Sequence, residues 1–133
     1  MQGQITSGTN CIAQRAAITA VLAPVSKVQY IVDEFKSRRD IVLELLGKIE
    51  GIKLNIPDGA FYVFPDISYF FGKSIKGKYI KDANEFSLFL LEEAGVASVT
   101  GAAFGAPNCI RLSYAASESV LREAVDRIQK ALQ

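Results

Sequence analysis

Apolar residues recur at helical spacing in four stretches of this chain, and the first two stretches are unusual. Cys11–Leu22 is apolar around most of its circumference, which is typical of a helix surrounded by other structure. A second helix is predicted from about Val25 to Leu46, because Pro24 suits a first helical turn. That helix would be roughly 35 Å long, more than a compact domain of this size requires. Both helices therefore predict a neighbouring domain or subunit.

Two further helices have local signals at their ends. Asp82 and Glu85 form a capping box before one of them, and Gly95 suits the position that follows its last residue. Ser117 is an N-cap candidate for the other helix. That helix should cover a core with one face, because it has an apolar stripe of Leu121, Ala124, Val125, Ile128 and Leu132.

Four shorter stretches have the composition or the alternation of strands. Ile52–Leu54 and Ala60–Phe64 flank the turn signature Pro57–Gly59, so a hairpin between them is predicted. Val96–Thr100 and Ile110–Tyr114 are the other two candidates. In the last of these, apolar side chains alternate with polar ones, which is typical of a strand with one buried face.

Residues 71–81 contain two glycines and four lysines. This composition predicts a solvated loop. A phosphate-binding loop is disfavoured, because the ordered glycine spacing of such loops is absent.

The order of the elements is helix, long helix, two strands, helix, two strands, helix. It predicts an α+β fold, in which a small, mostly antiparallel sheet is packed on one face by helices and preceded by a long interdomain helix. We expect one domain over residues 1–133. Residues 1–23 would pack on a neighbouring domain, residues 24–47 would form the long connecting helix, and residues 48–133 would form the α+β body.

The composition of the chain argues against several classes of function. Half of the 133 residues are apolar and the formal net charge is +1, so a nucleic acid or an anionic membrane is not an expected partner. The chain has no histidine, which excludes a self-contained Ser-His or Cys-His hydrolase and makes a zinc site improbable. Cys11 and Cys109 belong to no metal-binding cluster, and we expect two reduced thiols. Neither a signal peptide nor an apolar stretch of membrane-spanning length is visible, so a cytoplasmic location is expected.

Arg111 is the most informative candidate for a functional site. Because Ile110 and Leu112 should face the core, Arg111 should point to the opposite side of its strand. Such an arginine is either solvated, paired with a carboxylate on a neighbouring element, or directed at a ligand. A guanidinium group can bind a carboxylate through two parallel hydrogen bonds, so the ligand would be a carboxylate.

The residues around Arg111 resemble a motif of the class I/II aminotransferases, of the aspartate aminotransferase type. Val99–Gly105 and Asn108–Ala115 are similar to a "PGxxFG" loop followed by a strand ending "hRhSYA", where h is apolar. Thr100 stands where the family usually has proline. Three more segments resemble the family in the same order along the chain: Gln4–Thr9 with Ile12–Gln14, Pro57–Pro65 and Leu90–Ala97.

The resemblance implies the carboxy-terminal small domain of such an enzyme, which transfers an amino group between an amino acid and a 2-oxo acid. Arg111 would bind the substrate carboxylate. The resemblance also places Phe61 beside the cleft, although an aromatic segment of this kind is equally typical of the core of the small sheet. The full-length enzyme would use pyridoxal phosphate, include an N-terminal large domain and form a homodimer. The turn Thr6–Asn10 would lie near the dimer interface, although a plain helix cap explains its composition equally well.

The resemblance also implies what this chain lacks. None of its nine lysines stands in the context of the family's cofactor lysine. The other residues of the family that bind the cofactor belong to the amino-terminal part. We therefore expect no catalytic residue, no cofactor-binding residue and no bound cofactor in this piece, which would be inactive alone.

Two other functions remain open. The chain could be a stand-alone α+β module that binds a small carboxylate or regulates another protein, in which case Cys11–Leu22 should be covered by its own chain. It could also be the same domain of a related pyridoxal-phosphate lyase, since this family's frame supports eliminations and decarboxylations.

Overall fold

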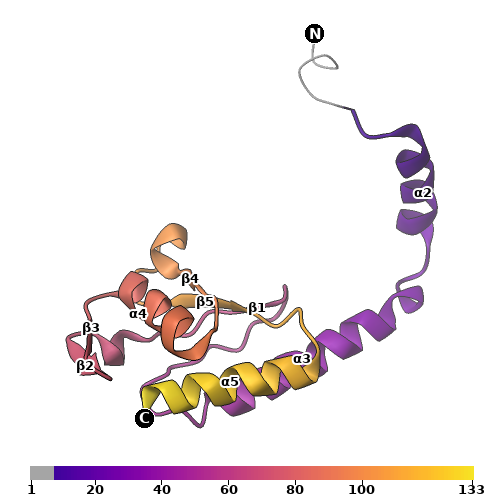
Figure 1. Ribbon diagram of the computed structural model, residues 1–133. Helices are drawn as coiled ribbons and strands as arrows, with labels where there is room; N and C mark the ends of the chain where they lie inside the picture. Colours follow the sequence, from indigo (N-terminus) through magenta and orange to yellow (C-terminus); the bar gives the residue numbers. More distant parts are fainter. Residues whose placement is uncertain (1–7) are drawn as a thin grey trace. The chain divides into compact units, whose positions relative to one another are not determined.

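The computed structural model describes residues 8–133 (Figure 1). The chain divides into two compact units, Met1–Asp33 and Glu34–Gln133. The segment Gln4–Thr9 and the turn Thr6–Asn10 lie largely outside the described residues. Asn10 itself is described, and its side-chain oxygen accepts a hydrogen bond of 2.8 Å from the backbone nitrogen of Ile12. Asn10 is therefore the N-cap of the helix that begins at Cys11.

Among the described residues, the first helix is α2 (Cys11–Leu22), which has the predicted bounds, whereas the helix after it is shorter than expected. Val25–Lys27 form a separate 3₁₀ turn, and α3 begins at Gln29 and ends at Leu46. The α-helix cannot extend back through Val28, because its φ of −117° and ψ of 7° leave the helical region. The 18 residues of α3 give a length of about 27 Å, not 35 Å.

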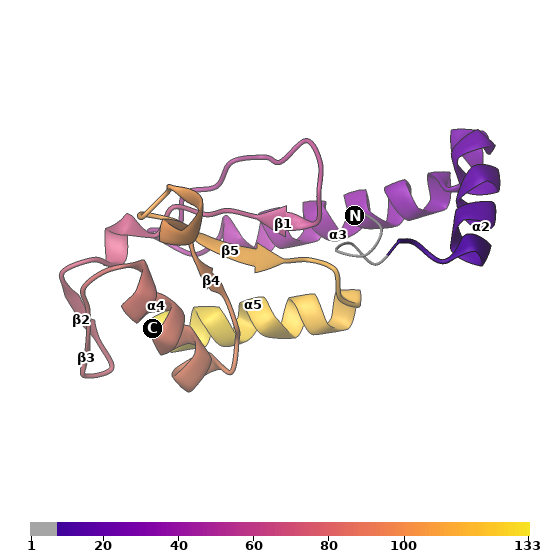
Figure 2. The ribbon, with the colours of Figure 1, turned by 90° about the horizontal axis from the view of Figure 1, so that it is seen from above.

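A small antiparallel sheet forms the centre of the second unit. Its strand order is β1 (Tyr62–Val63), β5 (Ile110–Ser113), β4 (Val99–Thr100), so β5 lies in the middle. In the register, Val63 faces Leu112 and Val99 faces Arg111. Figures 1 and 2 show α5 (Glu118–Leu132) and the second half of α3 on one side of this sheet. The predicted α+β class with a small antiparallel sheet is confirmed.

The core lies between this sheet and the helices. It includes Leu46 from α3, Ile110 from β5 and Ile128 from α5, each almost completely buried. The predicted stripe of α5 supplies three of its buried residues: Leu121, Val125 and Ile128. Fully burying side chains of this size stabilises the fold by about 1.5–3 kcal/mol each, so the core ties the second unit together.

Helix α4 (Ala83–Phe89) has the ends that its sequence predicts. Asp82 Oδ1 accepts hydrogen bonds from the backbone nitrogens of Asn84 and Glu85 at 2.9 and 3.1 Å. A π-helical turn, η3 (Leu90–Ala94), continues the element. Gly95 then ends it with a φ of 63°, a left-handed conformation that favours glycine.

The predicted hairpin between residues 52–54 and 60–64 is wrong. Lys53 forms its backbone bridge with Asp66, and Asp66 also bridges Cys109. Tyr62 and Val63 pair with β5 instead, because this pairing buries Val63 against the core. The chain does bend at residues 58–59, within the predicted turn. A turn alone, however, does not determine which segment pairs with the strand that follows it.

The solvated loop predicted at residues 71–81 is also wrong, since this segment forms a hairpin. Its strands are β2 (Lys73–Ile75) and β3 (Lys78–Ile80). Lys76 and Gly77 join them with φ values of 47° and 82°, as a tight hairpin turn requires. Ile80 is buried, whereas the lysines lie at the outer positions of the hairpin. Because lysines dominate the composition, the alternation of buried and exposed side chains is hard to recognise in the sequence.

The Asp66 carboxylate should make stability depend on pH. Its Oδ1 accepts hydrogen bonds from the hydroxyl and the backbone nitrogen of Ser68 at 2.6 and 2.8 Å, which lower the pKa of Asp66. A lowered folded-state pKa stabilises the fold above the ordinary pKa of about 3.9, and this stabilisation is lost as the pH falls through the lowered value. We expect Asp66→Asn to reduce the free energy of unfolding by about 1 kcal/mol at pH 7 and by less at pH 3.

Urea titrations at the two pH values measure this difference. Asp58→Asn on the exposed turn is the matched control and should change neither midpoint. An equal loss for Asp66→Asn at both pH values would contradict the prediction.

Candidate functional site

Arg111 lies on the central strand of the sheet, where the alternation of β5 places it. Its neighbour Ile110 is 1% exposed and Tyr114 is 2% exposed, so these residues face the core. Arg111 is half-buried and faces Val99 across the β4–β5 pair. The predicted opposition between Arg111 and the core-facing residues of its strand is therefore confirmed.

Two aromatic rings contact the guanidinium group of Arg111. Its Cζ lies 4.4 Å from the centroid of the Tyr62 ring and 4.6 Å from the centroid of the Phe104 ring. Among residues 8–133, no carboxylate forms an ion pair with Arg111, and no oxygen accepts a hydrogen bond from its side chain. The guanidinium therefore keeps its donor groups available.

The turn η4 (Gly101–Phe104) carries one of these rings. The backbone nitrogen of Gly101 donates a 2.7 Å hydrogen bond to the carbonyl of Cys109, which ties the start of the turn to the residue before β5. Thr100 Oγ1 accepts a 3.4 Å hydrogen bond from the backbone nitrogen of Ala102. Thr100 has a φ of −58°, which proline also adopts, so the departure from the family motif leaves the backbone geometry intact.

Phe61 lies beside this group and is 42% exposed. Its ring centroid is 4.4 Å from that of Tyr62 and 6.3 Å from that of Phe35. Tyr114 holds the backbone here, because its nitrogen donates to the carbonyl of Phe61 and its hydroxyl donates to the carbonyl of Ala60, both at 2.9 Å. Burial raises the pKa of Tyr114, so the hydroxyl keeps the proton that it donates.

The structure thus brings together both residues that the sequence singled out, Arg111 and Phe61, with Tyr62 between them. Sequence reasoning missed Tyr62 and Phe104 as neighbours of the guanidinium. Both rings stand inside motif segments, but nothing in a motif tells which side chains touch. Phe104 and Arg111 meet only because β4 and β5 pair.

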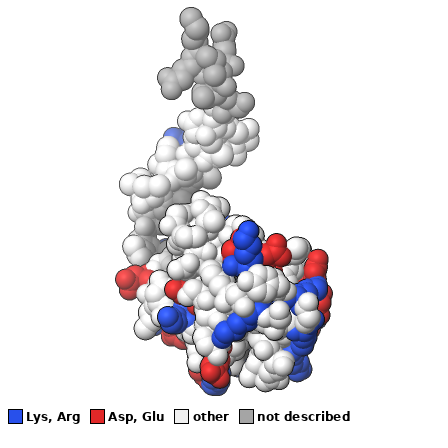
Figure 3. All heavy atoms as spheres, turned by 90° about the vertical axis from the view of Figure 1, so that its left-hand side faces the viewer, with Lys and Arg blue, Asp and Glu red and all other residues white. Residues whose placement is uncertain are grey.

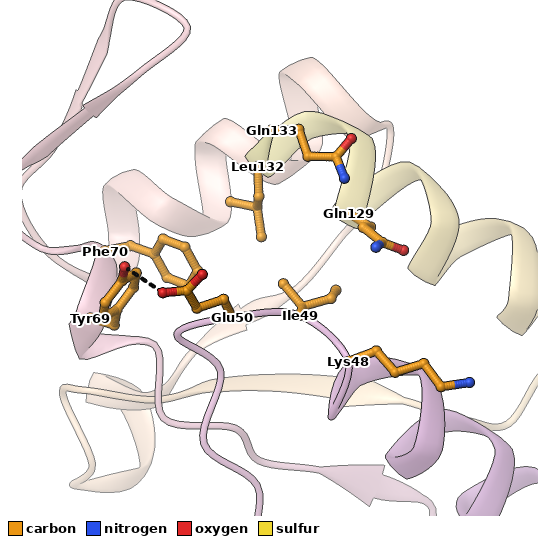
Figure 4. Close-up of a pocket in the computed structure, with 8 residues that line it drawn as sticks. All are labelled: Lys48, Ile49, Glu50, Tyr69, Phe70, Gln129, Leu132 and Gln133. Carbon is orange, nitrogen blue, oxygen red and sulfur yellow. Dashed lines mark hydrogen bonds between the residues drawn. The ribbon is translucent and has the colours of Figure 1, made fainter.

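A pocket of about 320 Å³ lies elsewhere in the second unit (Figure 4). Its lining includes Lys48, Glu50, Tyr69 and Gln129, and the hydroxyl of Tyr69 donates a 3.3 Å hydrogen bond to Glu50. The pocket shares no residue with the group around Arg111. On the face drawn in Figure 3, basic and acidic side chains both lie among uncharged ones, in keeping with the net charge of +1.

Comparisons with known proteins assign the chain to a family. The sequence model described as "Aminotransferase class I and II" matches residues 1–128. The chain belongs to the class I and II aminotransferases. A bifunctional aspartate aminotransferase and glutamate/aspartate-prephenate aminotransferase of Petunia hybrida is 44% identical to it over 99% of the chain and 28% of the relative.

Solved aminotransferases have the same fold over this region. The crystal structure of the aspartate aminotransferase from Rhizobium meliloti matches with a TM-score of 0.92 and 40% identity, covering 98% of this chain and 33% of that one. An alanine aminotransferase from Pyrococcus furiosus matches with a TM-score of 0.80 and 34% identity, covering 91% and 29%. The chain thus spans about a third of the length of the aminotransferases that it matches.

Membership in this family implies pyridoxal phosphate in a full-length enzyme, which binds it as a Schiff base on a lysine. The chain has nine lysines. All nine lie within the described residues and none is buried. The most enclosed, Lys78, forms ion pairs with Glu92 and Glu93, whose hydrogen bonds raise the pKa of its amino group. A Schiff-base lysine needs the opposite shift, because its neutral amine is the nucleophile.

Residues 8–133 contain neither a metal-binding cluster nor a membrane-spanning helix. No group of three or more cysteine, aspartate or glutamate residues there is placed to hold a metal ion. No helix in that part of the chain has the length and apolar character needed to cross a membrane.

Proposed function

We propose that this chain is the C-terminal, substrate-carboxylate-binding domain of an aspartate-type aminotransferase, and that Arg111 binds the carboxylate of the amino acid or 2-oxo acid. One observation carries the proposal. Arg111 is a half-buried arginine on the central strand without an ion-pair partner among the described residues. A half-buried positive charge that no carboxylate neutralises costs free energy, and a ligand carboxylate would supply the missing partner.

The chemistry of Arg111 follows from the geometry of its guanidinium. Two parallel N–H···O hydrogen bonds would fix both the position and the plane of the substrate carboxylate. Orientation of this kind can lower a reaction barrier by several kcal/mol, because the substrate loses its translational and rotational entropy on binding and not in the chemical step. Phe61, half-exposed beside Tyr62, would line the same cleft.

The rest of the enzyme would come from the other two thirds of a longer protein. Residues 1–23 would pack on a large N-terminal domain, residues 24–47 would connect the two, and residues 48–133 would close on the substrate. In support, the chain spans about a third of the length of the aminotransferases that it matches, and within its own unit α2 has no buried residue. The large domain would contribute the cofactor lysine, so we expect the chain to be inactive alone and the longer enzyme to be a homodimer.

The two alternatives make different demands on the chain. A stand-alone carboxylate-binding module should bind a small carboxylate without any further domain, which a binding measurement on the isolated chain tests. A pyridoxal-phosphate lyase should have lyases among its relatives, whereas those named above are all aminotransferases. The relatives differ in amino donor, so kinetic measurements with different amino acids are needed to identify the side chain of the substrate.

A chimera tests the proposal directly. Residues 1–133 replace the aligned third of the Rhizobium meliloti enzyme, whose fold over this region is so similar. We expect the chimera to bind pyridoxal phosphate and to transaminate aspartate with 2-oxoglutarate, since the large domain then supplies the cofactor site. The 133-residue chain alone should do neither.

The parent Rhizobium enzyme is the control for expression and assay. A folded chimera that binds the cofactor but transaminates no amino acid would contradict the proposal. Tight binding of 2-oxoglutarate by the isolated chain, measured by calorimetry, would favour the stand-alone module instead.

A further inference from the structure

The geometry points to Tyr62 and Phe104 as positioning residues for Arg111. We propose that their ring faces hold the guanidinium while leaving its N–H donors free for the substrate carboxylate. This inference rests on the proposed function of Arg111 and goes beyond it, since it names the groups that set the orientation of the arginine.

The two rings reach Arg111 from different elements. Tyr62 belongs to β1 and is paired with Ser113, two residues beyond Arg111 on the neighbouring strand. Phe104 ends the turn that follows β4. The guanidinium carbon lies 4.4 and 4.6 Å from the two ring centroids, well inside the distance of about 6 Å at which a cation is attracted to a ring. Two independent elements therefore converge on one cation.

Each ring is itself held by another ring. The centroids of Phe61 and Tyr62 are 4.4 Å apart. Phe64 packs on Phe104 edge to face, with centroids 6.0 Å apart and an interplanar angle of 84°. Since each ring that touches Arg111 has such a neighbour, its orientation is restricted before any substrate arrives.

Aromatic rings suit this task better than a carboxylate would. A carboxylate partner would occupy two guanidinium donors and cancel the charge that attracts the substrate. A ring face attracts the cation through its quadrupole and accepts no strong hydrogen bond. The donors at the guanidinium edge stay free, and the arginine stays charged, which agrees with its lack of an ion pair among residues 8–133.

The test must separate this role from simple packing. Phe104 is 50% exposed, so replacing it should leave the core and the fold intact. In the chimera, we expect Phe104→Leu to raise KM for aspartate and 2-oxoglutarate about 2- to 30-fold with little change in kcat, because a contact made equally in ground and transition states is lost. Phe104→Tyr should keep the parent KM, since it restores an aromatic face. Tyr79→Leu, an exposed aromatic of β3, is the control and should change nothing.

A second measurement uses the 133-residue chain. Ring currents should shift the Nε–Hε proton of Arg111 in NMR spectra, and the shift should fall in Phe104→Leu but persist in Phe104→Tyr. An unchanged KM in Phe104→Leu, or an equal rise in Phe104→Tyr, would overturn the inference. Failure of the proposed function looks different: Arg111→Gln itself would then leave KM and kcat of the chimera unchanged.

Discussion

Replacing Arg111 by glutamine should lower kcat/KM of the chimera for aspartate about 30- to 5,000-fold. Loss of one member of a hydrogen-bonded charge pair costs about 2–5 kcal/mol, and each 1.4 kcal/mol corresponds to about tenfold. Glutamine keeps an amide donor but neither the charge nor the pair of parallel donors. Arg111→Lys should be impaired as well, because lysine keeps the charge without the planar fork.

Arg122→Gln is the matched control for this experiment. Arg122 lies on α5, is exposed, and forms an ion pair of 2.8 Å with Glu118 one helical turn away. Exposed pairs of this kind contribute little, so kcat/KM and the melting temperature should stay at the parent values. Steady-state kinetics with aspartate and 2-oxoglutarate decide the outcome. Equal kcat/KM values for Arg111→Gln and Arg122→Gln would show that Arg111 does not bind the substrate.

Replacing Gly101 by alanine should destabilise the chain by about 3 kcal/mol and lower its melting temperature by about 10 °C. A Cβ at this position would lie 2.1 Å from the carbonyl oxygen of Ala106 and 2.5 Å from that of Cys109. Both are backbone atoms, so neither can turn aside as a side chain could. The backbone must shift where η4 meets β5, which would also displace Phe104 and Arg111.

Gly59→Ala is the control, because a Cβ there would meet nothing within 4 Å. Thermal unfolding followed by circular dichroism should separate the two variants clearly. In the chimera, Gly101→Ala should also raise KM even at temperatures where it remains folded. Equal melting temperatures for both variants would show that the turn can relax, contrary to this account.

The helix ends were the part of the fold most accessible to sequence reasoning. Asp82 caps α4 through bonds to residues two and three positions away, and Gly95 ends the following turn by its own φ. Such signals act over a single helical turn, so they can be read without knowledge of the rest of the chain. The start of α3 cannot be predicted from Pro24, because this residue is compatible both with the first turn of an α-helix and with the 3₁₀ turn that forms.

The pairing of the strands is harder to predict from the sequence than the ends of the helices. The segment at residues 60–64 was recognised as a strand, but its partner is β5, about 50 residues later, not the segment just before it. Partner choice depends on which pairing buries the most apolar surface, and that is a property of the assembled core. The hairpin β2–β3 has only a weak signal in the sequence, because its exposed positions are rich in lysine and Ile80 is its one deeply buried residue.

By itself, the sequence determined the α+β class, the family, and the strand that presents Arg111 opposite its buried neighbours. Alternation along one strand is enough for the last of these, because successive side chains of any strand point to opposite faces. Only the tertiary structure decided what surrounds the guanidinium. Tyr62 and Phe104 are about 40 residues apart in sequence, and they meet at Arg111 because β1 and β4 both pair with β5. Contacts across a sheet depend on register, and register is set by the whole core.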